Sequence, residues 1–287
     1  MPDFTLPEWV DKILKTPLRI NEYSDAELAA LKQKLARFST PNPIVSIVIP
    51  VWNEEEGILH MLLSLANTNT EYAVELIIVD NNSTDGTAAL LRQLGVQTLL
   101  ETKQGVGYAR TCGLHNARGK YYLSGDSDTL FPPGWITCMT KAMIDGEKEK
   151  VYCVHGTYSF LPSSPTPRWQ YACYETFSAV VIKKKGRSKP YLNVSGFNCG
   201  FIRQKGIEVN GYDIQIQKTF RGAAGGVIEE HAVEDGMMAL RLQEAGGAIK
   251  SLDSIDARVW TSDRRIQSDG GIKKAFVLRF KKHFFKN

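Results

Sequence analysis

Two aspartates, Asp126 and Asp128, stand one residue apart directly after the apolar run at 121–123. Side chains alternate along a strand, but where a strand ends and a turn begins, Asp-x-Asp can direct both carboxylates into one pocket. Adjacent like charges raise each other's pKa unless a cation neutralises them. Mg²⁺ commonly binds one or two carboxylates together with phosphate oxygens. The motif is therefore a candidate site for metal-bound diphosphate, although an Asp-rich turn can have the same sequence.

The acidic pair lies in a segment that alternates predicted strands with predicted helices. We expect strands over 44–50, 74–79, 96–100 and 120–123, and helices over 54–66, 87–94 and 107–116. This order predicts a parallel, doubly wound α/β sheet, in which ligands bind beyond the carboxyl ends of the strands. Four polar segments begin at those ends: 51–54, 80–87, 104–110 and 126–128. We therefore expect them to meet in one site.

The remaining elements are predicted on each side of this pattern. Ser24 and Glu27 have the spacing of a capping box that opens a helix. In the second half we expect one strand over 151–160, a basic loop over 183–189 and a helix from Glu234 to Glu244. The pattern divides the chain into an N-terminal helical extension (1–42), a single α/β domain (43–265) and a basic amphipathic C-terminal tail (266–287).

Composition excludes several classes of protein. The chain has 43% hydrophobic and 23% charged residues, as soluble globular proteins do. Net charge is +4, but residues 272–287 hold six bases and no acid, so the rest is slightly acidic and no uniform nucleic-acid-binding face is indicated. The five cysteines form no C-x-x-C pair, and neither a signal peptide nor a membrane span is recognisable. We expect a cytoplasmic protein.

Five motifs in order resemble those of the family 2 glycosyltransferases. They are 45–50 with Asn53 and Glu54; 79–87; 105–110; 126–128; and Glu234-Asp235 ahead of Leu240 and Leu242. The similarity covers residues 44–260. It implies the GT-A fold, a Rossmann-like, mostly parallel sheet flanked by helices. It also implies a nucleotide-sugar donor, a divalent cation (Mn²⁺ or Mg²⁺) and inversion at the anomeric carbon.

The resemblance assigns a nucleotide site to Pro50, Trp52, Glu54, Asp80, Asn81, Arg110, Asp126 and Ser127. Trp52 can stack on the base or be a core aromatic residue. Asp80 resembles the base-reading acid. The following position is often Asp in the family but is the amide Asn81 here, which both donates and accepts; uridine is favoured over guanosine.

Three further assignments concern charged residues. Asp126 is expected at the ribose or a metal-bound water, and Asp128 as the direct metal ligand. Arg110 can contact the base or diphosphate, or form a surface salt bridge. Near the site of a third family metal ligand, either Asp263 can bind the cation or Arg264 and Arg265 can clamp the diphosphate.

Glu234 and Asp235 resemble the catalytic pair of the family. An inverting transfer needs a base within hydrogen-bond reach of the acceptor hydroxyl, and that role is assigned to Asp235 with Glu234 in support. Acids are also common in the first turn of any helix, which is the structural alternative.

In the tail, Ile272, Phe276, Phe280 and Phe284 recur every fourth residue among basic residues. This pattern fits an in-plane helix at the anionic inner face of the membrane. It also fits a helix that packs its phenylalanines on the catalytic domain, with a solvated basic face.

These observations predict a metal-dependent, inverting glycosyltransferase of the hexosyltransferase type, with a UDP-sugar as the favoured donor. The acceptor would be the hydroxyl of a sugar, glycan or lipid-linked molecule, in cell-surface polysaccharide or glycolipid synthesis. One alternative is a sugar-nucleotide pyrophosphorylase, but its Gly-x-Gly-x-Arg loop is missing from 51–55. Another is a non-catalytic sugar-binding protein on the same scaffold.

Overall fold

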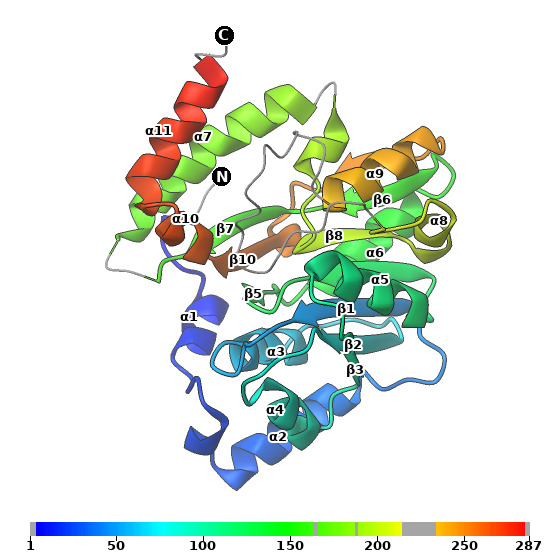
Figure 1. Cartoon of the computed structure of the whole chain (residues 1–287), viewed down its shortest axis with the longest axis vertical. Coiled ribbons are helices and arrows are strands. Elements are labelled where there is room, and N and C mark those ends of the chain that lie inside the picture. Colours follow the sequence, from blue (N-terminus) through cyan, green and yellow to red (C-terminus); the bar gives the residue numbers. More distant parts are fainter. Residues whose placement is uncertain (1–3, 164–165, 187–188, 214–233, 285–287) are drawn as a thin grey trace.

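The computed structural model of the chain describes residues 4–163, 166–186, 189–213 and 234–284. Its strands are β1 (Val45–Val51), β2 (Val74–Asp80), β3 (Thr98–Leu100), β4 (Tyr121–Gly125), β5 (Thr129–Leu130), β6 (Val151–His155), β7 (Thr157–Leu161), β8 (Asn198–Ile202), β9 (Ala248–Ser251) and β10 (Arg258–Ser262). Its α-helices are α1 (Glu8–Leu14), α2 (Asp25–Ala36), α3 (Ile58–Ala66), α4 (Thr87–Leu94), α5 (Val106–Asn116), α6 (Trp135–Asp145), α7 (Arg168–Gly186), α8 (Arg203–Glu208), α9 (Glu234–Glu244), α10 (Arg264–Ser268) and α11 (Gly271–Phe284). Figure 1 shows their arrangement.

The central sheet has seven strands in the order β3-β2-β1-β4-β8-β6-β9. Every neighbouring pair is parallel except those made by β8, which runs antiparallel to β4 and β6. All residues of β1 and β2 are buried, as their nearly continuous apolar sequences require of strands covered on both faces. The predicted mostly parallel sheet is confirmed.

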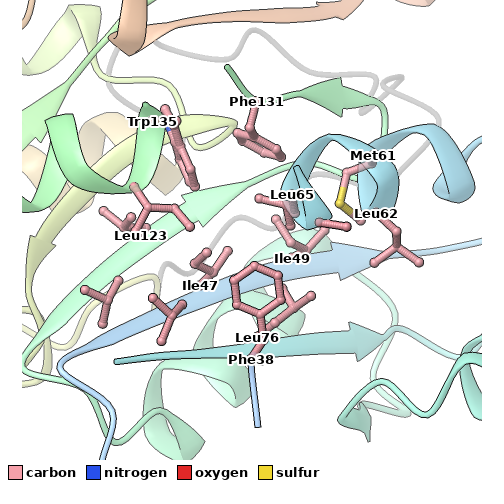
Figure 2. Packing of buried hydrophobic residues seen from close by; sticks show 14 of the residues in the cluster. Phe38, Ile47, Ile49, Met61, Leu62, Leu65, Leu76, Leu123, Phe131 and Trp135 are labelled. Atoms are coloured by element: carbon pink, nitrogen blue, oxygen red, sulfur yellow. The ribbon is translucent and has the colours of Figure 1, made fainter. Parts of the chain in front are cut away.

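Alternating strand residues build two cores, one on each face of the sheet. Ile47 and Ile49 of β1 lie in the first core, together with residues from α2, α3, α4 and α6. Figure 2 shows them near Leu65 of α3 and Trp135 of α6. Val48, between them, lies in the second core with residues from α5 and α9. Because both faces are covered, the polar segments at the carboxyl ends of the strands are the place left for a ligand.

A smaller sheet has three strands in the order β5-β10-β7. Strand β5 follows the Asp126–Asp128 segment, and β10 leads into α10. The expected single strand at 151–160 is wrong: it divides at Gly156 into β6 of the large sheet and β7 of the small one. The amide of Asn198 donates to the carbonyls of Thr157 and Ala257 at 2.7 and 2.8 Å. A side chain at position 156 would strike the Ala257 carbonyl, so only glycine fits this crossing.

The helices at the two ends of the chain pack on the sheet layers. Ser24 and Glu27 form the predicted capping box of α2, and α2 packs against α3. The expected basic loop at 183–189 is largely wrong, since α7 continues to Gly186. Helix α11 lies beside α7 (Figure 1), and the ring of Phe276 stacks on that of Phe177 with centroids 5.0 Å apart.

Candidate functional site

Hydrogen bonds lock the loops after β1 and β2 to each other. The side chain of Asn53, which has a positive φ of 53°, accepts a bond of 2.8 Å from the backbone of Thr84. The hydroxyl of Thr87 accepts one of 2.9 Å from the backbone N–H of Glu54. Glu55 in turn accepts from Gly86 at 2.9 Å. The loops after β1 and β2 are therefore hydrogen-bonded to each other along one edge of the site.

The Asp80-Asn81 pair at the end of β2 has two different environments. One oxygen of Asp80, which is 5% exposed, accepts from the backbone of Ser83 at 3.0 Å. The amide of Asn81 is fully buried; it donates to the carbonyls of Glu101 and Lys103 and accepts from Gly105 at 2.7 Å. Asn81 thus holds the loop before α5, and a carboxylate there could not donate to those carbonyls.

Three other residues that were predicted to bind the nucleotide lie at the same edge of the sheet. Pro50 is buried within β1, and Trp52 follows the strand as a half-buried residue. Ser127, 8% exposed, separates the two aspartates in the short connection from β4 to β5. The sheet topology therefore brings the ends of β1 and β4 together, because these two strands are hydrogen-bonded neighbours.

Arg110 joins three acids that lie far apart in the sequence. Its guanidinium contacts Asp126 at 2.7 Å, Glu234 at 3.3 Å and Asp235 at hydrogen-bond distance. The arginine side chain is 3% exposed, so these contacts are made in a medium of low polarity. The ring of Tyr212 lies beneath the guanidinium, with its centroid 5.6 Å away. Arg110 is a buried hub, and the surface salt bridge is wrong.

Asp235 is held from two sides at the start of α9. Arg110 binds one carboxylate oxygen, and the backbone N–H of Gly196 donates to the other at 2.7 Å. The pKa of Asp235 is raised to about 6, mainly by burial and also by the nearby charges of Glu234 and Asp126, while Arg110 and the Gly196 N–H act in the opposite direction. A carboxylate with such a pKa is suited to accept a proton near neutral pH.

A second arginine, Arg264, joins two acids at the mouth of the site. One nitrogen of its guanidinium donates to Glu54 at 2.6 Å and to Asp128 at 2.9 Å. Burial raises the pKa of both carboxyl groups, although the positive charge of Arg264 acts in the opposite direction. These two loops, which follow β1 and β4, therefore meet through this side chain.

Asp263 is fully buried and engaged within the protein. Its carboxylate accepts from the backbone of Ser163 at 3.1 Å and from the amide of Gln267 at 2.8 Å, and it also binds the hydroxyl of Tyr171. Of the alternatives at 263–265, this geometry favours Arg264 over Asp263 as the residue that faces the site.

Some members of the site were not predicted from the sequence. Gly196 was not singled out, and neither was Tyr212. A signal for Gly196 exists only in three dimensions: a side chain there would collide with the guanidinium of Arg110.

The carboxylates of Asp126 and Asp128 suit a hard divalent cation. The oxygens of a diphosphate would complete its coordination. The side chains of Asp126 and Asp128 are 27% and 25% exposed, so both carboxylates can be reached from solvent. Within the described ranges, no three His, Cys, Asp or Glu side chains form a ready-made metal cluster. Mg²⁺ and similar ions commonly keep water and phosphate oxygens as ligands beside one or two carboxylates. The residues present fit that kind of site.

Comparison with known proteins identifies the family of the chain. The model of the family described as glycosyl transferase family 2 matches residues 46–207. An uncharacterized glycosyltransferase of Bacillus subtilis is 32% identical over 113 residues, which are 38% of this chain and 29% of that protein. The Escherichia coli UDP-Glc:alpha-D-GlcNAc-diphosphoundecaprenol beta-1,3-glucosyltransferase WfaP is 27% identical over 206 residues, 64% of this chain and 79% of WfaP. Unlike WfaP, several other relatives are matched over only about a third of their own length.

Solved structures share the architecture at low sequence identity. A mannosyltransferase from Pyrobaculum calidifontis, in complex with GDP-Man and Mn²⁺, has a TM-score of 0.55 at 16% identity. The matched region covers 95% of this chain and 75% of the mannosyltransferase. TarS 1–349 from S. aureus, in complex with UDP-GlcNAc, has a TM-score of 0.53 at 18% identity and covers 76% and 58%.

Proposed function

The chain belongs to glycosyl transferase family 2 and has the GT-A fold, and we propose that it is an inverting glycosyltransferase that moves a sugar from a nucleotide-diphosphate donor to an acceptor hydroxyl. One observation carries this proposal: Arg110 binds Asp126 and Asp235 at once. The acid expected at the donor and the acid expected at the acceptor therefore share one site. Residues 43–265 would form the catalytic unit, with 1–42 and 266–287 as extensions.

The donor half of the site is assigned to the loops after β1, β2 and β4. Pro50, Trp52, Asp80 and Ser127 would surround the nucleoside, with UDP favoured, and Asn81 would hold the loop before α5 beside it. Asp128 and Asp126 would hold a divalent cation, which supplies Lewis-acid stabilisation of the leaving diphosphate. Charge on the leaving group is where stabilisation has its largest effect.

The acceptor half is assigned to the start of α9. Asp235 would accept the proton of the acceptor hydroxyl as that oxygen attacks the anomeric carbon from the side opposite the diphosphate. Its raised pKa of about 6 leaves most of it ionised at neutral pH yet basic enough to take a proton. Arg110 and the N–H of Gly196 would fix the orientation of Asp235, and Glu234 would support it through their shared partner Arg110. Arg110 would also hold both halves in register.

The acceptor class follows from similarity alone. WfaP is described as acting on a diphosphoundecaprenol-linked sugar, and other relatives as undecaprenyl-phosphate transferases. We propose a lipid-linked or glycan acceptor for this chain on that basis. In the described part of the chain, no helix combines the length and apolar character needed to span a bilayer.

Peripheral membrane contact through 272–287 is part of the same proposal, but the face of the helix that would meet the membrane differs from the one expected from the sequence. Ile272 and Phe276, expected at the lipid, pack on α7 instead. The same helix exposes Val277 and Leu278, 51% and 52% accessible, next to the exposed Lys273 and Lys274. Sedimentation with anionic vesicles tests the contact: the full chain should bind, a Leu278→Glu variant should bind less, and no binding by the full chain refutes it.

Two substitutions separate the donor role from the acceptor role. Asp128→Ala should lose metal-dependent UDP binding, measured by calorimetry with Mn²⁺. Asp235→Asn should keep that binding but lose sugar transfer. Asp145→Asn, an exposed carboxylate that pairs with Lys141 at the end of α6, is the matched control and should keep both.

Two outcomes would contradict these assignments. Normal transfer by Asp235→Asn would remove its role as the base. Binding of UDP and Mn²⁺ without turnover of any donor by the unmodified chain would instead indicate the non-catalytic sugar-binding protein.

A further inference from the structure

The bridge made by Arg264 has an unusual form, because a single nitrogen atom serves two carboxylates. That nitrogen lies 2.6 Å from an oxygen of Glu54 and 2.9 Å from an oxygen of Asp128. The two acids come from separate loops, after β1 and after β4. A point close to oxygens from two acids is also where a divalent cation would be held, because such ions prefer carboxylate oxygens as ligands.

We propose that Arg264 is an internal counter-cation: it occupies the cation position between Glu54 and Asp128 in the free protein, and the divalent ion displaces it. Both cannot remain there, because a guanidinium and a divalent ion a few ångströms apart repel each other strongly in a partly buried site. The arginine keeps the two acids together and neutralised until the metal arrives. Metal binding therefore includes breaking two charge-assisted hydrogen bonds.

The anchoring of Arg264 allows this exchange without unfolding of α10. The preceding residue, Asp263, is fully buried and bound by Ser163, Tyr171 and Gln267, so the backbone at this point is fixed. The side chain of Arg264 is 54% exposed, which leaves it room to turn toward solvent. A fixed backbone with a half-exposed guanidinium is the arrangement that a side-chain exchange requires.

The proposal rests on the proposed role of Asp128 as a metal ligand and adds Glu54 as a further carboxylate beside it, but it does not depend on the identity of the sugar. It is tested by titrating the full chain with MnCl₂ alone, without nucleotide, in a calorimeter. Arg264→Ala should bind Mn²⁺ about tenfold more tightly than the unmodified chain, since a competing charge and two hydrogen bonds are removed. Arg265→Ala is the control, because it deletes the same charge from the next, exposed residue of α10.

Each outcome decides the matter. A gain in Mn²⁺ affinity that is clearly larger in Arg264→Ala than in Arg265→Ala supports the exchange, because Arg265 acts on Asp128 through its charge but makes no bridge to it, as does binding that becomes measurable only in Arg264→Ala. Equal gains in both variants, unchanged or weaker binding in Arg264→Ala, or no Mn²⁺ binding by any of the three proteins overturns it. Arg264→Met, which keeps the alkyl chain, repeats the test if the alanine variant melts at a lower temperature.

The same titration separates this proposal from the proposed transferase activity. A gain in Mn²⁺ affinity in a protein that turns over no nucleotide sugar leaves the exchange standing and refutes the activity. Turnover of a donor by the unmodified chain, together with unchanged Mn²⁺ affinity in Arg264→Ala, supports the transferase activity and refutes the exchange.

Discussion

Replacing Arg110 with methionine tests the buried hub directly. The substitution keeps an unbranched side chain of similar length but removes the charge that Asp126, Glu234 and Asp235 share. Breaking a buried ion pair by removing one partner costs about 3–5 kcal/mol, because the other charge stays buried without compensation. Domains are typically stable by only about 5–15 kcal/mol. Arg110→Met should therefore lose a large part of the free energy of unfolding at pH 8.

The loss should shrink as the pH falls. The pKa of Asp235 is about 6 in the folded protein, against an ordinary value of 3.8, so the folded state binds a proton more readily than the unfolded state. Ionisation of this group therefore costs stability as the pH rises from about 4 through 6. Without Arg110 the folded pKa rises further, and this pH window extends upward. Protonation at pH 5.5 then relieves part of the penalty that is fully present at pH 8.

Urea unfolding at pH 8 and at pH 5.5 measures both effects. Arg110→Lys, which keeps the charge but not the planar fork that reaches three acids, should lose less than Arg110→Met. Arg19→Met, which removes an exposed pair with Glu56, is the control for an arginine at the surface and should leave the unfolding midpoint unchanged. A loss below about 1 kcal/mol at pH 8, the range of exposed pairs, or an equal loss at both pH values would refute the buried hub.

Three further predictions concern catalysis and the loops. Transfer should fall about tenfold per pH unit below about pH 6, as the base Asp235 gains a proton; a pH–rate profile without a break between pH 5 and 7 would contradict this. Gly196→Ala should lose transfer by about a hundredfold, because its side chain displaces the Arg110 guanidinium. Gly236→Ala, whose added carbon meets nothing closer than 3.5 Å, should retain activity in the same assay. Asn81→Asp should destabilise the fold by about 1–3 kcal/mol in thermal unfolding, since a carboxylate cannot donate to the two carbonyls that Asn81 holds; an unchanged melting temperature would count against the loop-anchoring role.

Local patterns were enough to predict most of the central sheet and its helices. The apolar runs of β1 and β2 and the helix starting at Glu234 are recognisable within a short window of sequence, and the structure has them within a few residues of the expected bounds. The break at Gly156 was not predictable in this way. It depends on the carbonyl of Ala257, a hundred residues later in the chain.

The same limit applies to the candidate site. Segment order and strand ends predicted that the acidic motifs would meet at one edge of the sheet. The acids that bind Arg110 could not be read from its local sequence. They are Asp126 and two residues at the start of α9, a helix that begins more than a hundred residues after Arg110. The substitution of Asn81 for the common Asp has a reason that only the structure supplies: the carbonyls of 101 and 103 require a donor.

The most direct test of the account is the release of nucleoside diphosphate from a panel of nucleotide sugars incubated with the full chain and Mn²⁺, with and without EDTA. We predict that at least one donor, with UDP-sugars the first to try, releases its nucleoside diphosphate, that EDTA abolishes the release, and that Asp128→Ala lacks it. Release that continues unchanged in EDTA, or no release and no binding with any donor in the panel, would contradict the proposal that this site holds a metal-bound nucleotide sugar.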